Sequence, residues 1–278
     1  MHFQAKICAY FLSKPVNMKK FFMCCGFLLC LSQHNQALPP DLLPSDVRSF
    51  SLGHLQALSH EFINPAYLSF HTHTSLGMAV HNQFEIEELN RPSCWAIVPN
   101  RLLDCGILFS SFHFSEYRLW VIRTGFSKKL SAGFSIGVNF LYLRETIDDW
   151  SENKSIFSSD VGIYCRLSPT VSVALLGSNL LNNSNLNTSL NGGIAIAFSE
   201  SCHLFIESAW CQLNGLVFRA GMEYELMNQF MIRTGIRNNP VVPCMGVEYA
   251  LHFLTVAAGF ELNTYLGISS AISITYSF

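Results

Sequence analysis

The sequence predicts an all-β fold, a transmembrane antiparallel β-barrel of about fourteen strands. Two observations lead to this prediction. From residue 66 onward, stretches of about ten residues alternate apolar side chains with small or polar ones, and polar turn residues separate the stretches. The last stretch, 266–278, ends the chain on Tyr276 and Phe278, and a tilted strand of about ten residues is long enough to cross a bilayer.

Residues 1–37 are predicted to be a secretory signal peptide. Two lysines precede an apolar run of eleven residues, 21–31, and a polar stretch follows it. That run is too short to form a membrane helix. Met18 is an alternative start of translation, and a lipoprotein anchor on Cys30 is an alternative to cleavage after the polar stretch. The bulky Leu29 before this cysteine disfavours the anchor.

The charge and the cysteine content exclude several classes of function. Beyond residue 37 the chain holds 13 Lys and Arg against 19 Asp and Glu, a formal charge of −6, so no nucleic acid partner is expected. Six of the ten cysteines lie in this part, and none forms a CxxC pair. We interpret them as small apolar fillers, with no assigned disulfide pairing and no expected metal or cofactor.

The alternation gives each strand a lipid face and an interior face. One stretch carries the apolar side chains Phe134, Ile136, Val138, Phe140 and Tyr142. Between them lie Ser135, Gly137 and Asn139. Similar stretches give about fourteen strands, with twelve as the alternative. A soluble β-sandwich would also alternate, but its polar face would carry more Lys, Glu and Thr than the Gly, Ser and Ala found here.

Polar breaks in the pattern are predicted to be loops or turns. The longest, 147–154 and 181–187, are rich in Asn and Asp, which is typical of the outer loops of such barrels. The stretches 127–130 and 227–229 are predicted to be tight turns at the opposite, periplasmic end.

Several charged side chains have interior parity. Glu223 is predicted to lie opposite Arg233 across a short turn, which would form a charge ladder in the lumen. The candidate lumen charges are Asp160, Arg166, Arg219, Glu223, Glu225, Arg233 and Arg237. They would either tune selectivity or hold a plug, and we favour a structural role because charges in such an interior must pair or be hydrated.

No catalytic arrangement is found, and the protein is predicted not to be an enzyme. Residues 133–137 match the G-x-S-x-G pattern of hydrolases, but that motif acts only at a strained strand-to-helix turn, and here it lies within a predicted strand. His71 and His73 are predicted to share the inward face of the first strand. Without a third ligand nearby they are interpreted as water-facing polar residues and not as a metal site.

The segment 47–70 contains a Leu-Gly step and then Asn64, Pro65 and Ala66 before the first predicted strand. Together with 129–135, the paired stretches 219–226 and 232–235, and the C-terminal strand, it resembles the FadL-like superfamily of outer-membrane barrels. Within that superfamily the chain is most similar to the PorV/PorQ-type branch. The resemblance covers nearly the whole chain beyond the signal peptide.

This resemblance implies that residues 38–65 form a hatch inside a barrel of residues 66–278, in the outer membrane of a Gram-negative bacterium. Asn64, Pro65 and Ala66 would be the hatch motif, and Tyr276 and Phe278 the C-terminal assembly signal. In the PorV/PorQ-type branch, the implied role is in type IX protein secretion or a cell-surface attachment complex. Its partners would be outer-membrane lipid and secretion-system proteins or secreted cargo.

The alternative is a FadL-like channel for hydrophobic small molecules. In such transporters, the resemblance implies, the solute passes beside the hatch through a lateral opening. The short segment 38–65 and the lack of a recognisable inward cluster of aromatic residues disfavour this alternative. The sequence therefore favours the secretion role.

Overall fold

The structure is a computed structural model that describes residues 46–59, 62–147, 152–181, 183, 185–212 and 215–278. The predicted signal peptide and the first eight residues of the predicted hatch lie outside this range. Among the described residues, no helix has the length and apolar content that a membrane crossing needs.

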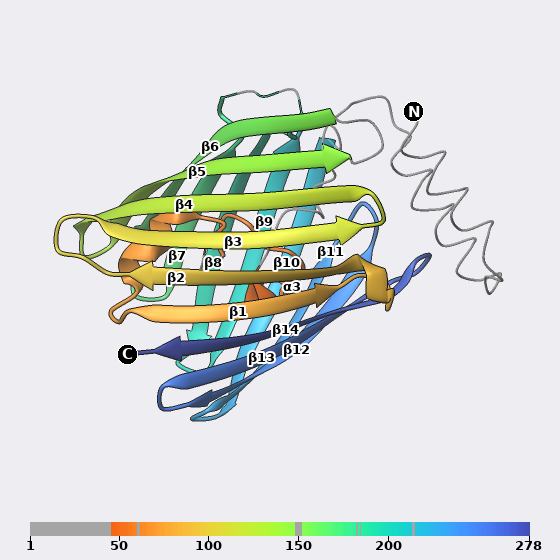
Figure 1. Cartoon of the computed structure of the whole chain (residues 1–278). Helices are drawn as coiled ribbons and strands as arrows, with labels where there is room; N and C mark the ends of the chain where they lie inside the picture. Colours follow the sequence, from red (N-terminus) through yellow and green to blue (C-terminus); the bar gives the residue numbers. More distant parts are fainter. Residues whose placement is uncertain (1–45, 60–61, 148–151, 182, 184, 213–214) are drawn as a thin grey trace.

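Fourteen antiparallel strands form one closed barrel, as the sequence predicts (Figure 1). Each strand pairs with its neighbours in the chain, and the last strand pairs back with the first, with Ser277 opposite Ser75. The strands are β1 (Ser75–Asn82), β2 (Asn90–Val98), β3 (Asp104–Phe114), β4 (Tyr117–Ser131), β5 (Phe134–Ile147), β6 (Glu152–Arg166), β7 (Val171–Ser178), β8 (Ser189–Ser199), β9 (Cys202–Cys211), β10 (Gly215–Met227), β11 (Phe230–Arg237), β12 (Val242–Leu251), β13 (Leu254–Asn263) and β14 (Gly267–Ser277).

Two local predictions need correction. The barrel begins at Ser75 and not at residue 66, because Pro65–Phe70 forms a 3-10 helix, η2. The side chain of Asn64 caps this helix, and proline at the first helical position fixes the backbone angle that the helix needs. The stretch 127–130 is not a turn: β4 continues to Ser131 with a bulge after Lys129. The predicted turn 227–229 is present between β10 and β11.

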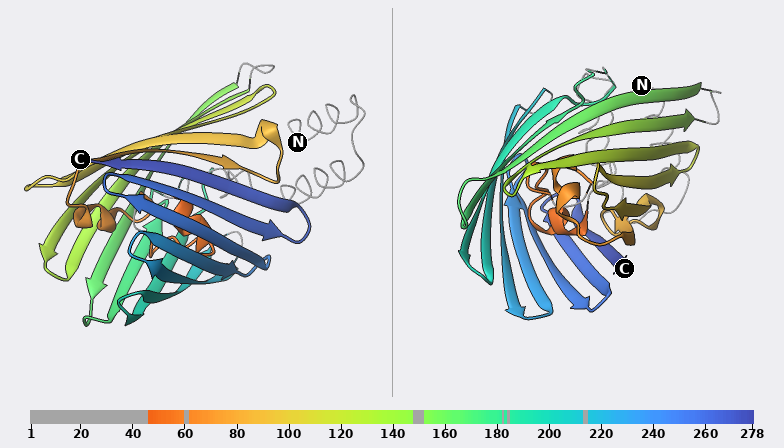
Figure 2. Two further views of the ribbon diagram at one scale, coloured as in Figure 1. Left: turned by 90° about the horizontal axis from the view of Figure 1, so that it is seen from below. Right: turned by 90° about the vertical axis from the view of Figure 1, so that its left-hand side faces the viewer.

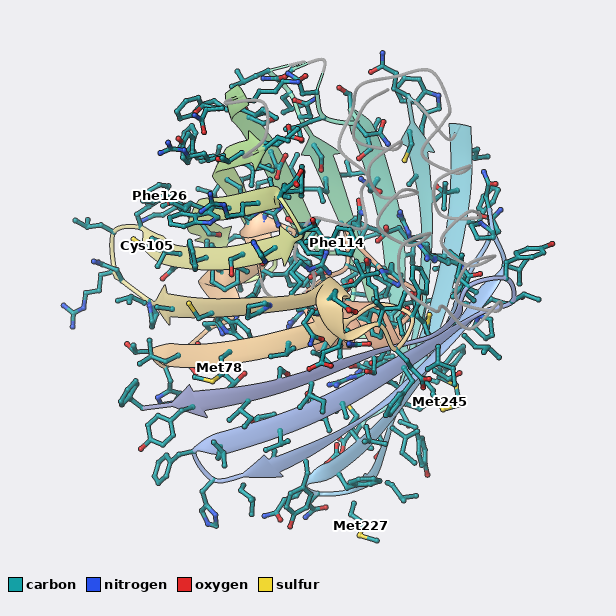
Figure 3. All side chains as sticks on the ribbon, turned by 45° about the vertical axis from the view of Figure 1, so that its right-hand side comes forward. Met78, Cys105, Phe114, Phe126, Met227 and Met245 are labelled. Carbon is teal, nitrogen blue, oxygen red and sulfur yellow. The ribbon has the colours of Figure 1, made fainter. Side chains whose placement is uncertain are left out.

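The outer face of the barrel carries the apolar side chains that the alternation assigns to it. On β5, Phe140 is 54% exposed while its neighbour Asn139 is fully buried. The closing strand β14 exposes Ile272 and Ile274 on the same outer surface. Figure 3 shows Met78 and Met245, from opposite parts of the chain, projecting outward. Such a continuous apolar surface is what contact with lipid requires.

A segment before β1 lies inside the barrel, and we call its described residues, 46–59 and 62–70, the luminal segment (Figure 2). It contains the short helix α3 (Val47–Ser51) and η2. Asp46 caps α3 by accepting the Ser49 amide, and its other carboxylate oxygen accepts the Ser59 hydroxyl. The Asp46 carboxylate therefore fixes both the start of α3 and the position of Ser59, where the chain comes back beside the helix.

The apolar side chains of the luminal segment complete the interior packing. Phe50 and Phe62 join inward-facing residues of the wall such as Trp95 in one cluster. Leu52 and Leu58 join others in a second cluster. The barrel interior is therefore a packed core along the length of this segment.

Candidate functional site

The luminal segment packs against a ring of inward-facing glycines, which we call the glycine belt. Its members are Gly106, Gly125, Gly137, Gly162, Gly193, Gly221, Gly235, Gly246 and Gly259. Several are direct cross-strand neighbours, for example Gly137 with Gly162 and Gly221 with Gly235. A side chain at these positions would meet the luminal segment, so the belt leaves the room in which the segment lies.

The predicted hatch motif lies on one part of this belt. A Cβ atom on Gly162 would be 1.9 Å from Oδ1 of Asn64, and one on Gly137 would be 2.5 Å from the carbonyl carbon of Pro65. The Asn64 Nδ2 donates to the Ala57 carbonyl at 2.6 Å and its Oδ1 accepts the Ala66 amide at 3.0 Å. The motif is therefore a fully hydrogen-bonded turn pressed against the wall.

The wall also binds the backbone of this turn. The hydroxyls of Ser135 and Ser127 both donate to the Ala66 carbonyl, at 2.9 and 3.2 Å. The Asn139 Nδ2 donates to the Phe62 carbonyl at 2.8 Å. These side chains are small and polar because they satisfy backbone groups that lie outside any strand or long helix.

The predicted ladder of charges forms, with an additional member from the luminal segment. Glu223 lies opposite Arg233, the register that the sequence predicts, and its Oε1 accepts from Arg233 Nε at 2.7 Å. Arg48 donates to both Glu223 oxygens, each at 2.7 Å, and Arg233 also contacts Glu248 at 2.8 Å. Burial alone would lower the pKa of Arg48, but the Glu223 carboxylate holds it above its ordinary value.

A second buried carboxylate binds the backbone of the luminal segment. Glu207 is fully buried and accepts the amides of Gln56 at 3.0 Å and Leu58 at 3.2 Å. Its other partner is Arg219, whose Nη1 lies 2.8 Å from Oε1. Glu207 and Glu223 thus hold the segment from β9 and β10, next to each other on the wall.

The remaining predicted lumen charges lie apart from this ladder. Asp160 is buried on β6 and accepts the Asn179 amide at 3.0 Å. Arg237 lies 3.6 Å from Glu261. Arg166 is exposed at the end of β6, and Glu225 is half-buried near the end of β10. Of the seven, Arg219, Glu223, Arg233 and Arg237 therefore belong to the ion-pair contacts that surround the luminal segment.

Toward the end of the barrel where β5 ends, the inward face changes from polar to apolar. Ser135 and Asn139 on β5 are followed by the buried Leu141 and Leu143. We call the whole group the apolar cluster: Phe112, Phe114, Tyr117, Leu119, Val121, Leu141, Leu143, Ile156 and Leu186. The expectation that the lumen lacks an inward group of aromatic residues is therefore wrong. Phe112 and Phe114 of β3 meet Tyr117 of β4 across the β3–β4 hairpin, and this grouping appears only once the strands are aligned in register.

The two histidines that the sequence places on the first strand lie before it. His71 follows η2 as its cap residue, and β1 starts only at Ser75. His73 bonds through Nδ1 to the carbonyl oxygen of Phe278 at 2.9 Å. They do not form a pair on one strand face.

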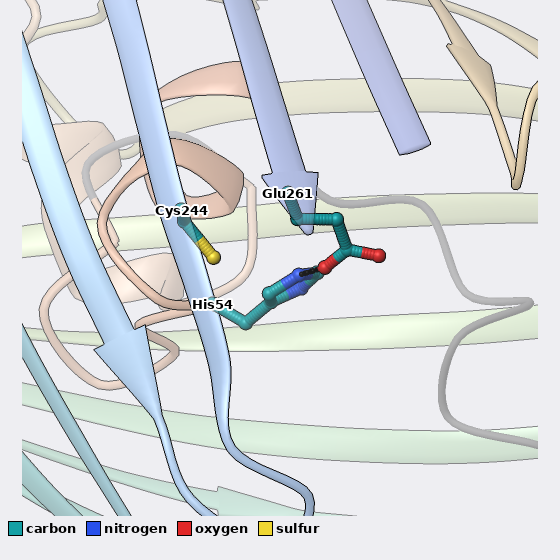
Figure 4. Close-up of side chains that lie close together, drawn as sticks. All are labelled: His54, Cys244 and Glu261. Carbon is teal, nitrogen blue, oxygen red and sulfur yellow. Dashed lines mark hydrogen bonds and ion pairs between the residues drawn. The ribbon is translucent and has the colours of Figure 1, made fainter. Parts of the chain in front are cut away.

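The structure brings together a different group that the sequence does not indicate. His54, Cys244 and Glu261 offer ligand atoms that all lie within 4.8 Å of one another (Figure 4). His54 comes from the luminal segment, and the other two come from β12 and β13. About 200 residues separate His54 from the other two in sequence, so no spacing pattern could reveal the group.

Tyr67 in η2 packs edge-to-face against Tyr164 of β6, with ring centroids 5.0 Å apart. Burial raises the pKa of the Tyr67 phenol far above its ordinary value, so it stays neutral. In η2, Tyr67 therefore contributes ring packing and a neutral polar hydroxyl.

The C-terminal residues lie on the outer surface of the barrel. Tyr276 and Phe278 are exposed, and their rings contact each other edge-to-face at 5.0 Å. The Phe278 amide donates to the Thr74 carbonyl at 2.9 Å, which extends the closure between β14 and β1 by one residue.

No protein-family model matches the sequence, and no curated protein sequence matches it either. Solved structures do match its fold. The chain is similar to a deltaS2S3 mutant of the monoaromatic hydrocarbon channel TodX, with a TM-score of 0.66 and 12% identity over 86% of this chain and 100% of that one. It is also similar to the toluene transporter TbuX of Ralstonia pickettii, with a TM-score of 0.63 and 12% identity over 86% and 99% of the two chains.

A FadL homologue of Pseudomonas aeruginosa gives a TM-score of 0.62 and 8% identity, over 85% of this chain and 99% of that one. At such low identity these matches establish the fold, which is a FadL-like barrel of fourteen strands.

Proposed function

We propose that this protein is a non-enzymatic outer-membrane channel for hydrophobic small molecules, in which the luminal segment acts as the hatch. The observation that carries the proposal is the apolar cluster. Inward-facing Leu, Ile, Phe and Tyr side chains at one end of the barrel provide a favourable environment for an apolar solute. If the luminal segment were only a structural plug, the barrel would not need an apolar inward surface next to it.

The arrangement along the barrel axis supports this route. On β4, the inward residues run from Leu119 and Val121 in the apolar cluster to Gly125 and Ser127, which contact the luminal segment. Leu186, which precedes β8, is buried in the same cluster. A solute that enters from the loop end would therefore meet apolar side chains first and the luminal segment second.

The outer surface supports a membrane location. Exposed Leu, Ile, Val, Phe and Met side chains occur on all parts of the barrel wall, and this surface would be unstable in water. Outer-membrane lipid is therefore the expected environment. The neighbours with this fold are described as hydrocarbon channels and toluene transporters, which agrees with the proposal.

The secretion or surface-attachment role of the PorV/PorQ-type branch rests on sequence resemblance alone. Type IX secretion proteins or cargo as partners stay a prediction. The apolar cluster agrees with the channel, because inward apolar side chains suit a hydrophobic solute.

The test is uptake of a monoaromatic hydrocarbon such as toluene into vesicles that contain the purified barrel. Leu119→Asn should lower uptake about tenfold, because it places an unsatisfied amide in the apolar cluster. Leu119→Met is the matched control, since it keeps the surface apolar, and it should leave uptake unchanged. No uptake by the parent protein, with a stoichiometric protein partner seen by native mass spectrometry, would replace the channel with the secretion role.

A further inference from the structure

Three side chains with different donor atoms meet where the luminal segment crosses β12 and β13. The His54 Nε2 lies 2.7 Å from Glu261 Oε2, and the Cys244 sulfur lies on the neighbouring strand beside them (Figure 4). Cys244 and Glu261 face each other directly in the register of β12 and β13. The group is therefore fixed by the barrel on one side and by the luminal segment on the other.

The backbone of the luminal segment turns His54 toward these strands. Gly53 and His54 both have positive φ, +81° and +61°. This conformation is uncommon for a residue other than glycine. The Gly53 backbone lies so close to the wall that a Cβ there would be 2.7 Å from the Ile236 oxygen. Edge-to-face contact with Phe50 at 5.0 Å fixes the imidazole ring from the other side.

The donor set matches a borderline transition-metal cation. Imidazole nitrogen, thiolate sulfur and carboxylate oxygen are the three protein ligands of Zn²⁺, and three such ligands leave one coordination position open. Calcium and magnesium prefer oxygen donors alone, so they do not suit this set.

The distances require only small side-chain movements. Bonds of about 2.0–2.3 Å to a tetrahedral Zn²⁺ place donor atoms roughly 3.3–3.8 Å apart. Here the donor atoms lie within 4.8 Å of one another, and the His54–Glu261 pair is already at 2.7 Å. The ion would replace that hydrogen bond and draw the sulfur inward, while the thiol proton passes to solvent.

We infer that His54, Cys244 and Glu261 form a site for Zn²⁺ or a similar transition-metal cation, and that the ion fastens the luminal segment to β12 and β13. This site goes beyond the proposed channel function and does not depend on it. A bound metal would add a strong contact between the segment and a part of the wall that Glu207 and Glu223 do not reach.

Arg237 is the group that opposes metal binding. Its Nη2 lies 3.6 Å from the Glu261 oxygen, so its charge competes with a cation for that carboxylate. Arg237→Gln should therefore strengthen metal binding. If Glu261 served only as the ion-pair partner of Arg237 and did not bind metal, this substitution would leave the metal affinity of the protein unchanged.

The experiment uses the full folded barrel in detergent, titrated with Co²⁺ and then with Zn²⁺ as competitor. A thiolate ligand gives Co²⁺ an intense sulfur-to-metal charge-transfer band in the near ultraviolet, which Zn²⁺ should abolish. Cys244→Ser should remove the band, and His54→Gln and Glu261→Gln should each weaken Co²⁺ binding at least tenfold.

Cys211→Ser is the matched control. Cys211 is also a buried free cysteine, but it lies on β9 outside the group, so its removal should leave the band and the affinity unchanged. An absent band, or equal spectra for Cys244→Ser and Cys211→Ser, would overturn the proposal.

A second measurement uses the unmodified chain, so its result does not depend on whether the variants fold. Zn²⁺ should slow the reaction of Cys244 with a maleimide at least tenfold while leaving Cys211 unaffected, as read by mass spectrometry of the labelled peptides. Equal labelling of Cys244 with and without Zn²⁺ would also overturn the proposal. Neither measurement involves solute uptake, so failure of this site would leave the channel proposal standing.

Discussion

Two regions of the barrel interior differ in how they are built. Around the luminal segment the wall is rich in glycine, serine and paired charge, and many of these groups bind the segment directly. Beyond it, in the apolar cluster, the wall is leucine, phenylalanine and tyrosine. One strand can therefore serve both purposes. On β5 the outward residues from Phe134 to Tyr142 stay apolar while the inward residues change from Ser135 and Asn139 to Leu141 and Leu143.

The largest loss of stability is expected on removing Glu223, the carboxylate that two buried arginines around the luminal segment share. Glu223→Ala would leave Arg48 and Arg233 buried without their shared carboxylate, at a cost of about 3–5 kcal/mol. The luminal segment should then become accessible to protease, measured by limited proteolysis of the folded barrel.

Glu248→Ala is the control for this prediction. Glu248 contacts only Arg233 among the ion pairs of the described residues, and it is more exposed than Glu223. Its removal should cost much less, and equal protease sensitivity of both variants would show that Glu223 does not hold the segment.

A smaller effect is expected from filling the glycine belt. A Cβ on Gly235 would lie 2.2 Å from the Leu52 carbonyl carbon, so Gly235→Ala should lower the free energy of unfolding by about 1–3 kcal/mol. Urea unfolding in lipid vesicles measures this. Gly192→Ala is the matched control, because its Cβ would meet only the end of a leucine side chain at 3.2 Å. Equal stability of both variants would contradict the close fit of the segment.

Asn64 tests the hydrogen bonds of the motif apart from its packing. Asn64→Ala removes the cap of η2 and the bond to Ala57, and should cost about 1–2 kcal/mol. It should also raise solute uptake if the segment closes the route. Asn64→Asp keeps the oxygen that caps η2 but places a buried carboxylate oxygen against the Ala57 carbonyl, so it should cost at least as much stability as Asn64→Ala. Uptake that is equal in all three proteins would count against a hatch role.

The smallest change in stability is expected at the outer surface, which serves as a reference for both interior regions. Deleting Phe278 removes one exposed ring and one backbone hydrogen bond to Thr74, worth about 1 kcal/mol. We expect a lower yield of the heat-modifiable folded band on a gel, because the terminal aromatic residue is predicted to act in assembly. Phe278→Tyr should assemble normally, and normal assembly of the deletion would refute this role.

Glu223 and Arg233 illustrate what can be read along the chain. They lie on strands joined by a short turn, so alternation and turn length together predict their register, and the structure has them opposite each other. Arg48, which binds the same carboxylate, comes from 175 residues away in sequence. No local pattern contains that pairing, since a short segment without repeating structure can pack against many parts of a barrel wall.

From the sequence alone one could predict the outer face and a barrel of about fourteen strands, because each strand repeats a two-residue period that lipid on one side enforces. The structure decides between the fourteen strands and the alternative of twelve. The three-dimensional arrangement is needed to locate the luminal segment, to identify the residues of the apolar cluster and to bring His54 beside Cys244 and Glu261. The positions of the luminal segment and of the His54 group depend on contacts between residues far apart in sequence, which exist only once the barrel has closed around the segment. The apolar cluster depends on how the neighbouring strands β3 to β6 align beside one another.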